Sequence, residues 1–99
     1  MGEISNVLKD YIDYTIKLVV DNPDDVRVEL TISTKTVIVQ IYVHKSDIGK
    51  VIGRKGRIIE SLKVLCLSIK NTRFPKDLKR ILLEVIEDED STFSFNDNK

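Results

Sequence analysis

The amino-acid sequence predicts an α+β fold in which three helices pack on one face of a three-stranded sheet. Three observations lead to this prediction. Apolar residues recur at helical spacing over residues 4–19, and two short segments at 26–32 and 37–43 then alternate apolar and polar residues. A second helical region over residues 47–69 is interrupted by glycines and precedes a last alternating segment at 81–86. The expected order is helix, strand, strand, helix, glycine loop, helix, strand, which is a layered α+β architecture.

The first predicted helix carries its apolar residues at the i, i+3, i+4, i+7 spacing of an amphipathic helix that packs one face on a core. These residues are Ile4, Val7, Leu8, Tyr11, Ile12, Ile16, Leu18 and Val19. The helix is expected to end before Pro23, because the residue before a proline is disfavoured in the helical conformation.

Two strands are expected next, because side chains of period two are typical of a half-buried strand. Apolar residues alternate first at Val26, Val28, Leu30 and Ile32, and then at Val37, Val39, Ile41 and Val43. Only a short polar turn, Ser33-Thr34-Lys35, separates the two segments. The sequence therefore predicts an antiparallel hairpin.

The second helical region begins at Ser46-Asp47, which is typical of a helix N-terminus with an oxygen-bearing cap. Gly53 and Gly56 limit the first helix of this region to about two turns. The helix that follows has an apolar stripe at Ile58, Ile59, Leu62, Leu65, Cys66 and Ile69. Val64 and Leu67 lie off that stripe, and two interpretations remain open for them: a dimer face, or burial at the edge of the core.

The last predicted strand, residues 81–86, ends the folded domain, which we place at residues 1–86. Residues 87–99 are acidic and poor in aliphatic side chains, and we expect a disordered tail there. The tail is opposite in charge to the glycine loop, which predicts that it folds back on the loop and competes with a bound anion.

The net charge of zero conceals a strong asymmetry along the chain. Residues 44–80 contain eleven lysines and arginines and three acidic residues, whereas the remaining sequence contains five basic and thirteen acidic residues. A basic segment around a glycine loop indicates a polyanionic partner.

Several function classes find no support in the sequence. No apolar run approaches the roughly 18 residues of a membrane span, and the early Glu3 argues against a signal peptide. One histidine, His44, and one cysteine, Cys66, do not make a metal site. The glycine spacing is not that of a nucleotide-binding loop. We therefore expect a cytoplasmic protein that is not an enzyme, with no catalytic residues, no cofactor and no membrane partner.

The segment Gly53-Arg54-Lys55-Gly56 is the strongest functional signal in the chain. Glycine at both ends of a tight turn lets the backbone approach another chain, because no Cβ stands in the way. The positive charges of Arg54 and Lys55 indicate that this partner is negatively charged. Arg57 and Lys50 extend the positive surface on either side. The expected ligand is a phosphodiester backbone, held by side chains and by the amides at the start of the next helix.

In its context, Val51-Ile52-Gly53-Arg54-Lys55-Gly56-Arg57-Ile58-Ile59, this loop resembles the KH-domain signature V-I-G-x-x-G-x-x-I. The order of elements is similar to that of type II KH domains, and the chain most resembles the small single-domain bacterial RNA-binding proteins of the KhpA family. The resemblance covers residues 4–86.

The resemblance implies that the loop clamps about four nucleotides of single-stranded RNA. It also implies that the bases lie in an aliphatic groove to which Gly49, Ile52 and Ile59 contribute. An RNA chaperone or post-transcriptional regulator is the function implied, acting as a homodimer or as a heterodimer with a larger KH-containing protein. The alternative is a protein-interaction module that pairs with another KH protein and for which RNA binding is secondary.

Overall fold

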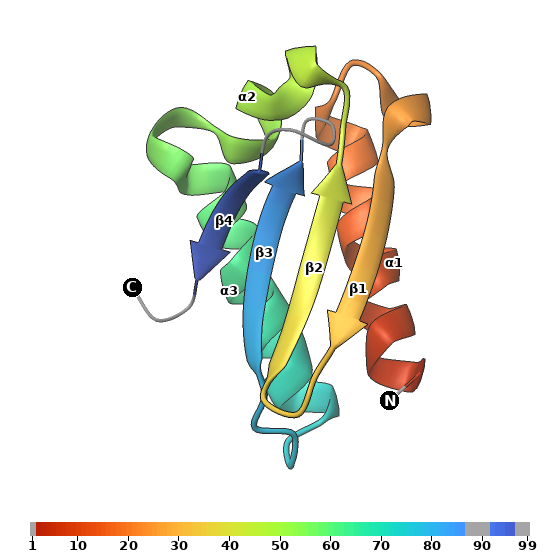
Figure 1. Cartoon of the computed structure of the whole chain (residues 1–99), viewed down its shortest axis with the longest axis vertical. Helices are drawn as coiled ribbons and strands as arrows, with labels where there is room; N and C mark the ends of the chain where they lie inside the picture. Colours follow the sequence, from red (N-terminus) through yellow and green to blue (C-terminus); the bar gives the residue numbers. More distant parts are fainter. Residues whose placement is uncertain (1, 87–91, 97–99) are drawn as a thin grey trace.

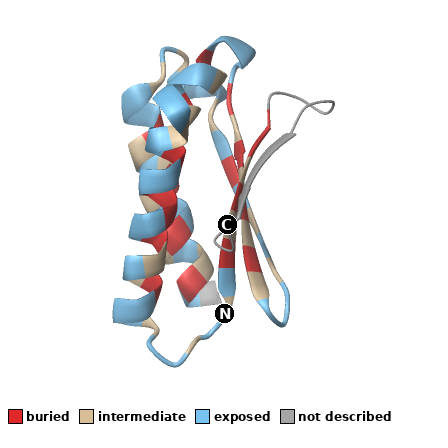
Figure 2. Ribbon diagram, turned by 90° about the vertical axis from the view of Figure 1, so that its left-hand side faces the viewer, coloured by how far each residue is buried: buried red, intermediate tan, exposed pale blue. Residues whose placement is uncertain are grey.

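The computed structural model describes residues 2–86 and 92–96. In this part of the chain, three α-helices cover one face of a four-stranded sheet (Figures 1 and 2). The helices are α1 (Gly2–Val19), α2 (Ile48–Ile52) and α3 (Arg57–Arg73). The strands are β1 (Arg27–Ile32), β2 (Thr36–Tyr42), β3 (Arg80–Ile86) and β4 (Thr92–Asn96). The predicted α+β class and the predicted order of elements are confirmed.

Helix α1 packs against the sheet through the stripe that the sequence predicts. Ile4, Leu8, Ile12 and Ile16 are at most 2% exposed. The stripe is narrower than expected at its C-terminal end, where Leu18 is 68% exposed and Val19 is 38% exposed. Both follow Ile16, the last buried residue of α1, which ends at Val19.

The predicted hairpin is confirmed, since β1 and β2 pair antiparallel with Ile32 opposite Val37. The amide of Ser33 donates to the carbonyl of Thr36 at 2.8 Å and closes the turn. Residues Val37, Val39 and Ile41 point into the core and are fully buried. The same alternation continues in β3 at Ile81, Leu83 and Val85.

Strand β3 pairs parallel to β2, with Thr36 opposite Arg80 and Tyr42 opposite Ile86. A parallel pair needs a connection that returns along the length of the sheet, and α2, the glycine loop and α3 together form this crossover (Figure 1). The glycine loop consequently lies at one end of the sheet, near the last residues of β2 and β3.

The structure adds a strand that the sequence analysis did not expect. Residues 92–96 form β4, which pairs antiparallel with β3, Ile86 being opposite Thr92 and Leu82 opposite Asn96. The sequence Thr-Phe-Ser-Phe-Asn alternates polar and aromatic residues, as strands do, and the edge of β3 offers unpaired backbone groups. The rest of the expected disordered tail, residues 87–91 and 97–99, lies outside the described residues.

No helix in the described ranges combines the length and the apolar character that a membrane span requires.

Candidate nucleic-acid interface

The glycine loop joins α2 to α3 through a short 3₁₀ turn, Arg54–Gly56. The amide of Gly53 donates to the carbonyl of Gly49 at 2.8 Å and ends α2, and the amide of Gly56 donates to the carbonyl of Gly53 at 3.1 Å. Gly53 has a φ of 79°, a backbone conformation that L-residues rarely adopt. A Cβ on Gly53 would also lie 2.7 Å from Cγ1 of Ile58. Glycine is therefore required at this position for two independent reasons.

Two further loop residues adopt positive φ angles. Gly56 has a φ of 73°, and Lys55 has a φ of 59°. Among the residues that the structure describes, Lys55 is the one non-glycine residue with positive φ. Such a conformation costs a residue with a side chain about 1–2 kcal/mol. The backbone strain of the domain is thus located at an exposed cation in the middle of the loop.

The loop presents a cluster of exposed positive charges. Arg54, Lys55 and Arg57 are all exposed, and no carboxylate of the described residues lies within ion-pair distance of any of the three. Lys50 behaves differently, because its Nζ lies 3.6 Å from Oδ2 of Asp21. Both side chains of that pair are well exposed, so the pair contributes little to stability.

The N-terminus of α3 adds backbone donors to these charges. The helix has 17 residues and begins at Arg57, and its N-cap residue, Gly56, provides no side-chain hydrogen bond. The amide of Arg57 donates to the carbonyl of Arg54, whereas the next amides of a helix N-terminus have no intrahelical partner and carry partial positive charge. Amides and guanidinium or ammonium groups therefore surround the same short stretch of surface.

The three residues expected to line the base groove differ in accessibility. Gly49 is exposed, and a Cβ at this position would meet nothing within 4 Å. Ile52 is half-buried and packs against the core. Ile59 is fully buried in the core. Gly49 and Ile52 form accessible surface next to the loop, whereas the buried side chain of Ile59 packs α3 against the core.

Asp47 holds the site in place, and sequence reasoning missed this role. It was expected to cap α2, but it makes no such bond. Its buried carboxylate instead accepts hydrogen bonds from the amides of Asp21 and Asn22 at 3.1 and 3.0 Å, and from Nδ2 of Asn22 at 3.0 Å. The two segments are more than 20 residues apart, so no local sequence signal relates them.

These contacts also determine the charge of Asp47. Burial alone would raise the pKa of the carboxyl group, but the hydrogen bonds from the Asn22 side chain and from the Asp21 and Asn22 amides outweigh burial and lower the pKa. The carboxylate stays ionised at neutral pH and ties the end of α1 to the start of α2.

The remaining candidates for chemistry belong to the core. Cys66 is buried, and burial raises the pKa of its thiol to about 12. Burial likewise raises the pKa of Tyr11 to about 12. In residues 2–86 and 92–96, no group of three or more His, Cys, Asp or Glu residues is placed to hold a metal ion.

Comparison with known proteins gives consistent results. The family model described as "KhpA/KhpB, KH domain" matches residues 9–85. A protein named RNA-binding protein KhpA from Mycobacterium leprae is 46% identical over 66 residues, which cover 67% of this chain and 82% of the relative. A protein of the same name from Chlamydia caviae is 36% identical over 81 residues, covering 82% of this chain and 99% of the relative. No solved structure gives a significant match.

Proposed function

The chain belongs to the KhpA/KhpB family of KH-domain proteins, and on this basis we propose that it binds single-stranded RNA at the loop Gly53–Gly56. The observation that carries the proposal is the loop itself: a turn with positive φ angles that presents exposed cations beside an uncapped helix N-terminus.

In the proposed complex, the phosphates of about four nucleotides pass over the loop. The amides at the start of α3 donate to phosphate oxygens, while Arg54, Lys55 and Arg57 neutralise their charge. These contacts position the strand without reading its sequence. The bases then lie along the surface that Gly49 and Ile52 leave open, where the absence of a side chain on Gly49 allows a base or ribose to approach.

The mechanism needs only binding groups, so we propose no catalytic role for any residue of the domain. We also propose a cytoplasmic location for the protein. We propose that the protein acts on RNA as a chaperone or post-transcriptional regulator, and a second binding module would raise its effective affinity through avidity.

We propose that the exposed face of α3 contacts the second binding module. Val64 and Leu65 are each 50% exposed and Ile58 is 38% exposed, whereas Leu67 packs against the core. Of the two interpretations open for Val64 and Leu67, exposure favours a pairing face for Val64 and core packing for Leu67. A second copy of the chain and a larger KH-containing protein are both candidate partners, and pairing alone is the alternative function.

The test removes loop charge without disturbing the backbone. In the double variant Arg54→Gln, Lys55→Asn, asparagine tolerates the left-handed conformation of position 55. With about three phosphates neutralised, the slope of log K against log salt is about −2, and losing two contacts reduces its magnitude by about 1.4. The measurement is RNA affinity by fluorescence anisotropy over a range of salt concentrations.

The matched control is Lys9→Gln, Lys17→Gln on α1, which removes the same charge; Lys9 is exposed, and Lys17 forms a surface pair with Asp13. The control is expected to keep the wild-type slope. Equal slopes for wild type and loop variant would show that the loop is not the RNA-binding element, and retention of a partner complex by that variant would then favour the pairing module.

A further inference from the structure

A second basic surface lies at the opposite end of the molecule from the glycine loop (Figure 1). Here the turn between β1 and β2 meets the segment between α3 and β3, and the two segments border an open hollow of about 590 Å³. We call it the far-end hollow. Its charged and apolar lining residues are Lys35, Lys76, Asp77, Leu78, Lys79 and Arg80.

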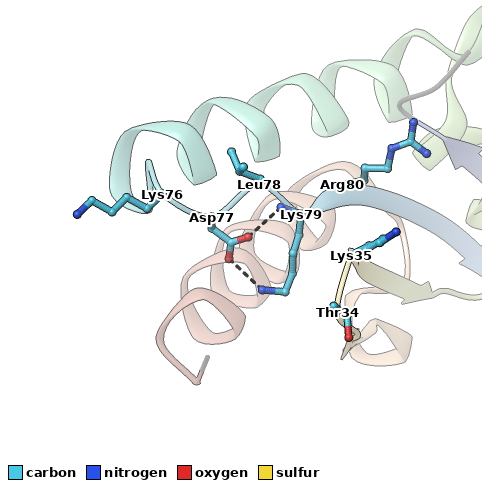
Figure 3. Close-up of a pocket in the computed structure, with 7 residues that line it drawn as sticks. All are labelled: Thr34, Lys35, Lys76, Asp77, Leu78, Lys79 and Arg80. Atoms are coloured by element: carbon cyan, nitrogen blue, oxygen red, sulfur yellow. Dashed lines mark hydrogen bonds and ion pairs between the residues drawn. The ribbon is translucent and has the colours of Figure 1, made fainter.

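Backbone contacts fix the positions of these residues. The amide of Arg80 donates to the carbonyl of Lys35 at 2.9 Å, so Lys35, in the turn before β2, and Arg80, the first residue of β3, are neighbours along the backbone. Lys76 stands on the other side of the hollow and points into solvent (Figure 3). Lys35 and Lys76 are both exposed. The cations therefore border the hollow from two sides.

The single acidic residue of the lining, Asp77, is already compensated. Its Oδ1 accepts a hydrogen bond from the Lys79 amide at 2.9 Å, and its Oδ2 lies 3.5 Å from Nζ of Lys79. The buried Nζ of Lys70 donates to the carbonyl of Asp77 at 2.6 Å and brings another positive charge beneath the segment. The lining of the hollow thus carries more positive than negative charge, which attracts anions.

We propose that the far-end hollow is a second contact surface for the RNA backbone. This inference rests on the proposed function, because it extends the same ligand to a second site. Helix α3 separates the two sites by about 25 Å, given 17 residues at about 1.5 Å each. At about 3.4 Å per stacked nucleotide this distance corresponds to about seven nucleotides. An RNA longer than the footprint of the loop is therefore held at two points.

The side chain of Leu78 favours contact of the hollow with an RNA base as well as with phosphates. It is 90% exposed at the rim of the hollow, where an unstacked base of a strand held by the neighbouring cations covers its apolar surface. The part of α3 between the two sites presents Val64 and Leu65 to solvent, so the two basic surfaces are separate sites and not one continuous phosphate path.

The test uses Lys35→Gln, Lys76→Gln, compared with Lys9→Gln, Lys17→Gln as an equally charged control. The ligands are a 16-nucleotide unstructured RNA and its tetranucleotide fragment. For the 16-mer, we expect the slope of log K against log salt to be smaller in magnitude by about 1.4 in the far-end variant than in wild type. A fourfold rise in salt concentration therefore weakens RNA binding by this variant about sevenfold less than it weakens binding by wild type. The control keeps the wild-type slope, and the gain in affinity from tetranucleotide to 16-mer shrinks only in the far-end variant.

Amide chemical shifts distinguish failure of this inference from failure of the proposed function. With the 16-mer, resonances of residues 34–36 and 76–80 are expected to move in addition to those of residues 49–59. Movement of the loop resonances alone, or an unchanged slope, would overturn the far-end site and leave the loop intact. If no resonance moves, the proposed function itself is wrong. A far-end response to a poly-glutamate peptide but not to RNA would assign the hollow to an acidic protein and overturn the inference.

Discussion

Gly53 combines a positive φ with direct contact to Ile58, and these two constraints predict what a methyl group does there. Gly53→Ala forces the 2.7 Å contact with Cγ1 of Ile58 and adds backbone strain. We expect the free energy of unfolding to fall by about 1–3 kcal/mol, measured by urea denaturation. An unchanged midpoint would contradict the loop conformation.

Gly49→Ala is the matched substitution four residues earlier. Its Cβ meets nothing within 4 Å, and the residue lies in α2. Alanine should therefore stabilise the domain by up to about 1 kcal/mol through helix propensity. If a base or ribose lies against this surface, the same variant binds RNA more weakly. A more stable protein with unchanged RNA affinity would remove Gly49 from the binding surface.

A substitution at Lys55 distinguishes the effect of backbone conformation from the effect of side-chain charge. Lys55→Gly relieves the strain at φ 59° but removes the cation. We expect a domain at least as stable as wild type, with weaker RNA binding. Thermal unfolding and RNA titration of the same sample measure the two effects independently. Tighter binding by this variant would indicate that conformation, and not the charge of Lys55, limits affinity.

At the scale of elements, Asp47 predicts how the junction of α1 and α2 responds to pH. Its folded pKa is lowered, so the contribution of the carboxylate to stability is present above the unfolded value of about 3.9 and is lost as pH falls through the folded value. Asp47→Ala should lower the melting temperature at pH 7 and flatten the acid limb of the stability curve. Asp24→Ala, at an exposed position, serves as the control that leaves both unchanged.

The exposed face of α3 predicts the behaviour of the proposed assembly. Leu65→Glu places a charge on a half-exposed apolar side chain, so it should weaken self-association or partner binding while leaving the fold intact. Sedimentation velocity measures the change in oligomeric state. Leu78→Glu, at an equally apolar but distant position, is the control. Identical sedimentation of the Leu65 variant and wild type, both as oligomers, would place the interface elsewhere.

Local patterns were sufficient to predict most of these elements. The stripe of α1, the alternation in β1 to β3 and the glycines that end α2 each act within a few residues, and all were legible in the sequence. Three features were not. Asp47 bonds to residues more than 20 positions away. Ile58 and Leu65 belong to the predicted apolar stripe of α3 but are exposed, whereas Ile59 is buried as predicted. Strand β4 depends on the free edge of β3. Each is decided by tertiary packing, which a sequence pattern does not encode.

At the scale of the molecule, charge segregation predicts competition for the basic loop. Glu87, Asp88, Glu89 and Asp90 follow β3 in sequence, and the flanking pair Ile86 and Thr92 lies at the end of the sheet near α2. The fold-back of this acidic run concerns residues outside the described ranges and remains a prediction. Deleting residues 88–99 would also remove β4, so neutralisation to Gln and Asn is the sharper experiment.

This fourfold neutralisation should tighten RNA binding at low salt, and the difference should disappear at high salt because exposed charges are screened. Titration of both proteins at two salt concentrations checks the prediction. Affinities that agree at low salt would show that the acidic run does not compete with RNA.

The parallel pairing of β2 with β3 has a consequence for the protein during synthesis. Gln40 contacts Glu84, 44 residues later in the chain, and the whole loop lies between them. Contacts this distant form late, since the intervening chain must close first. A nascent polypeptide therefore has its glycine loop outside the ribosome before the sheet that orients the loop is complete, so the ability to grip RNA arises only once β3 has emerged.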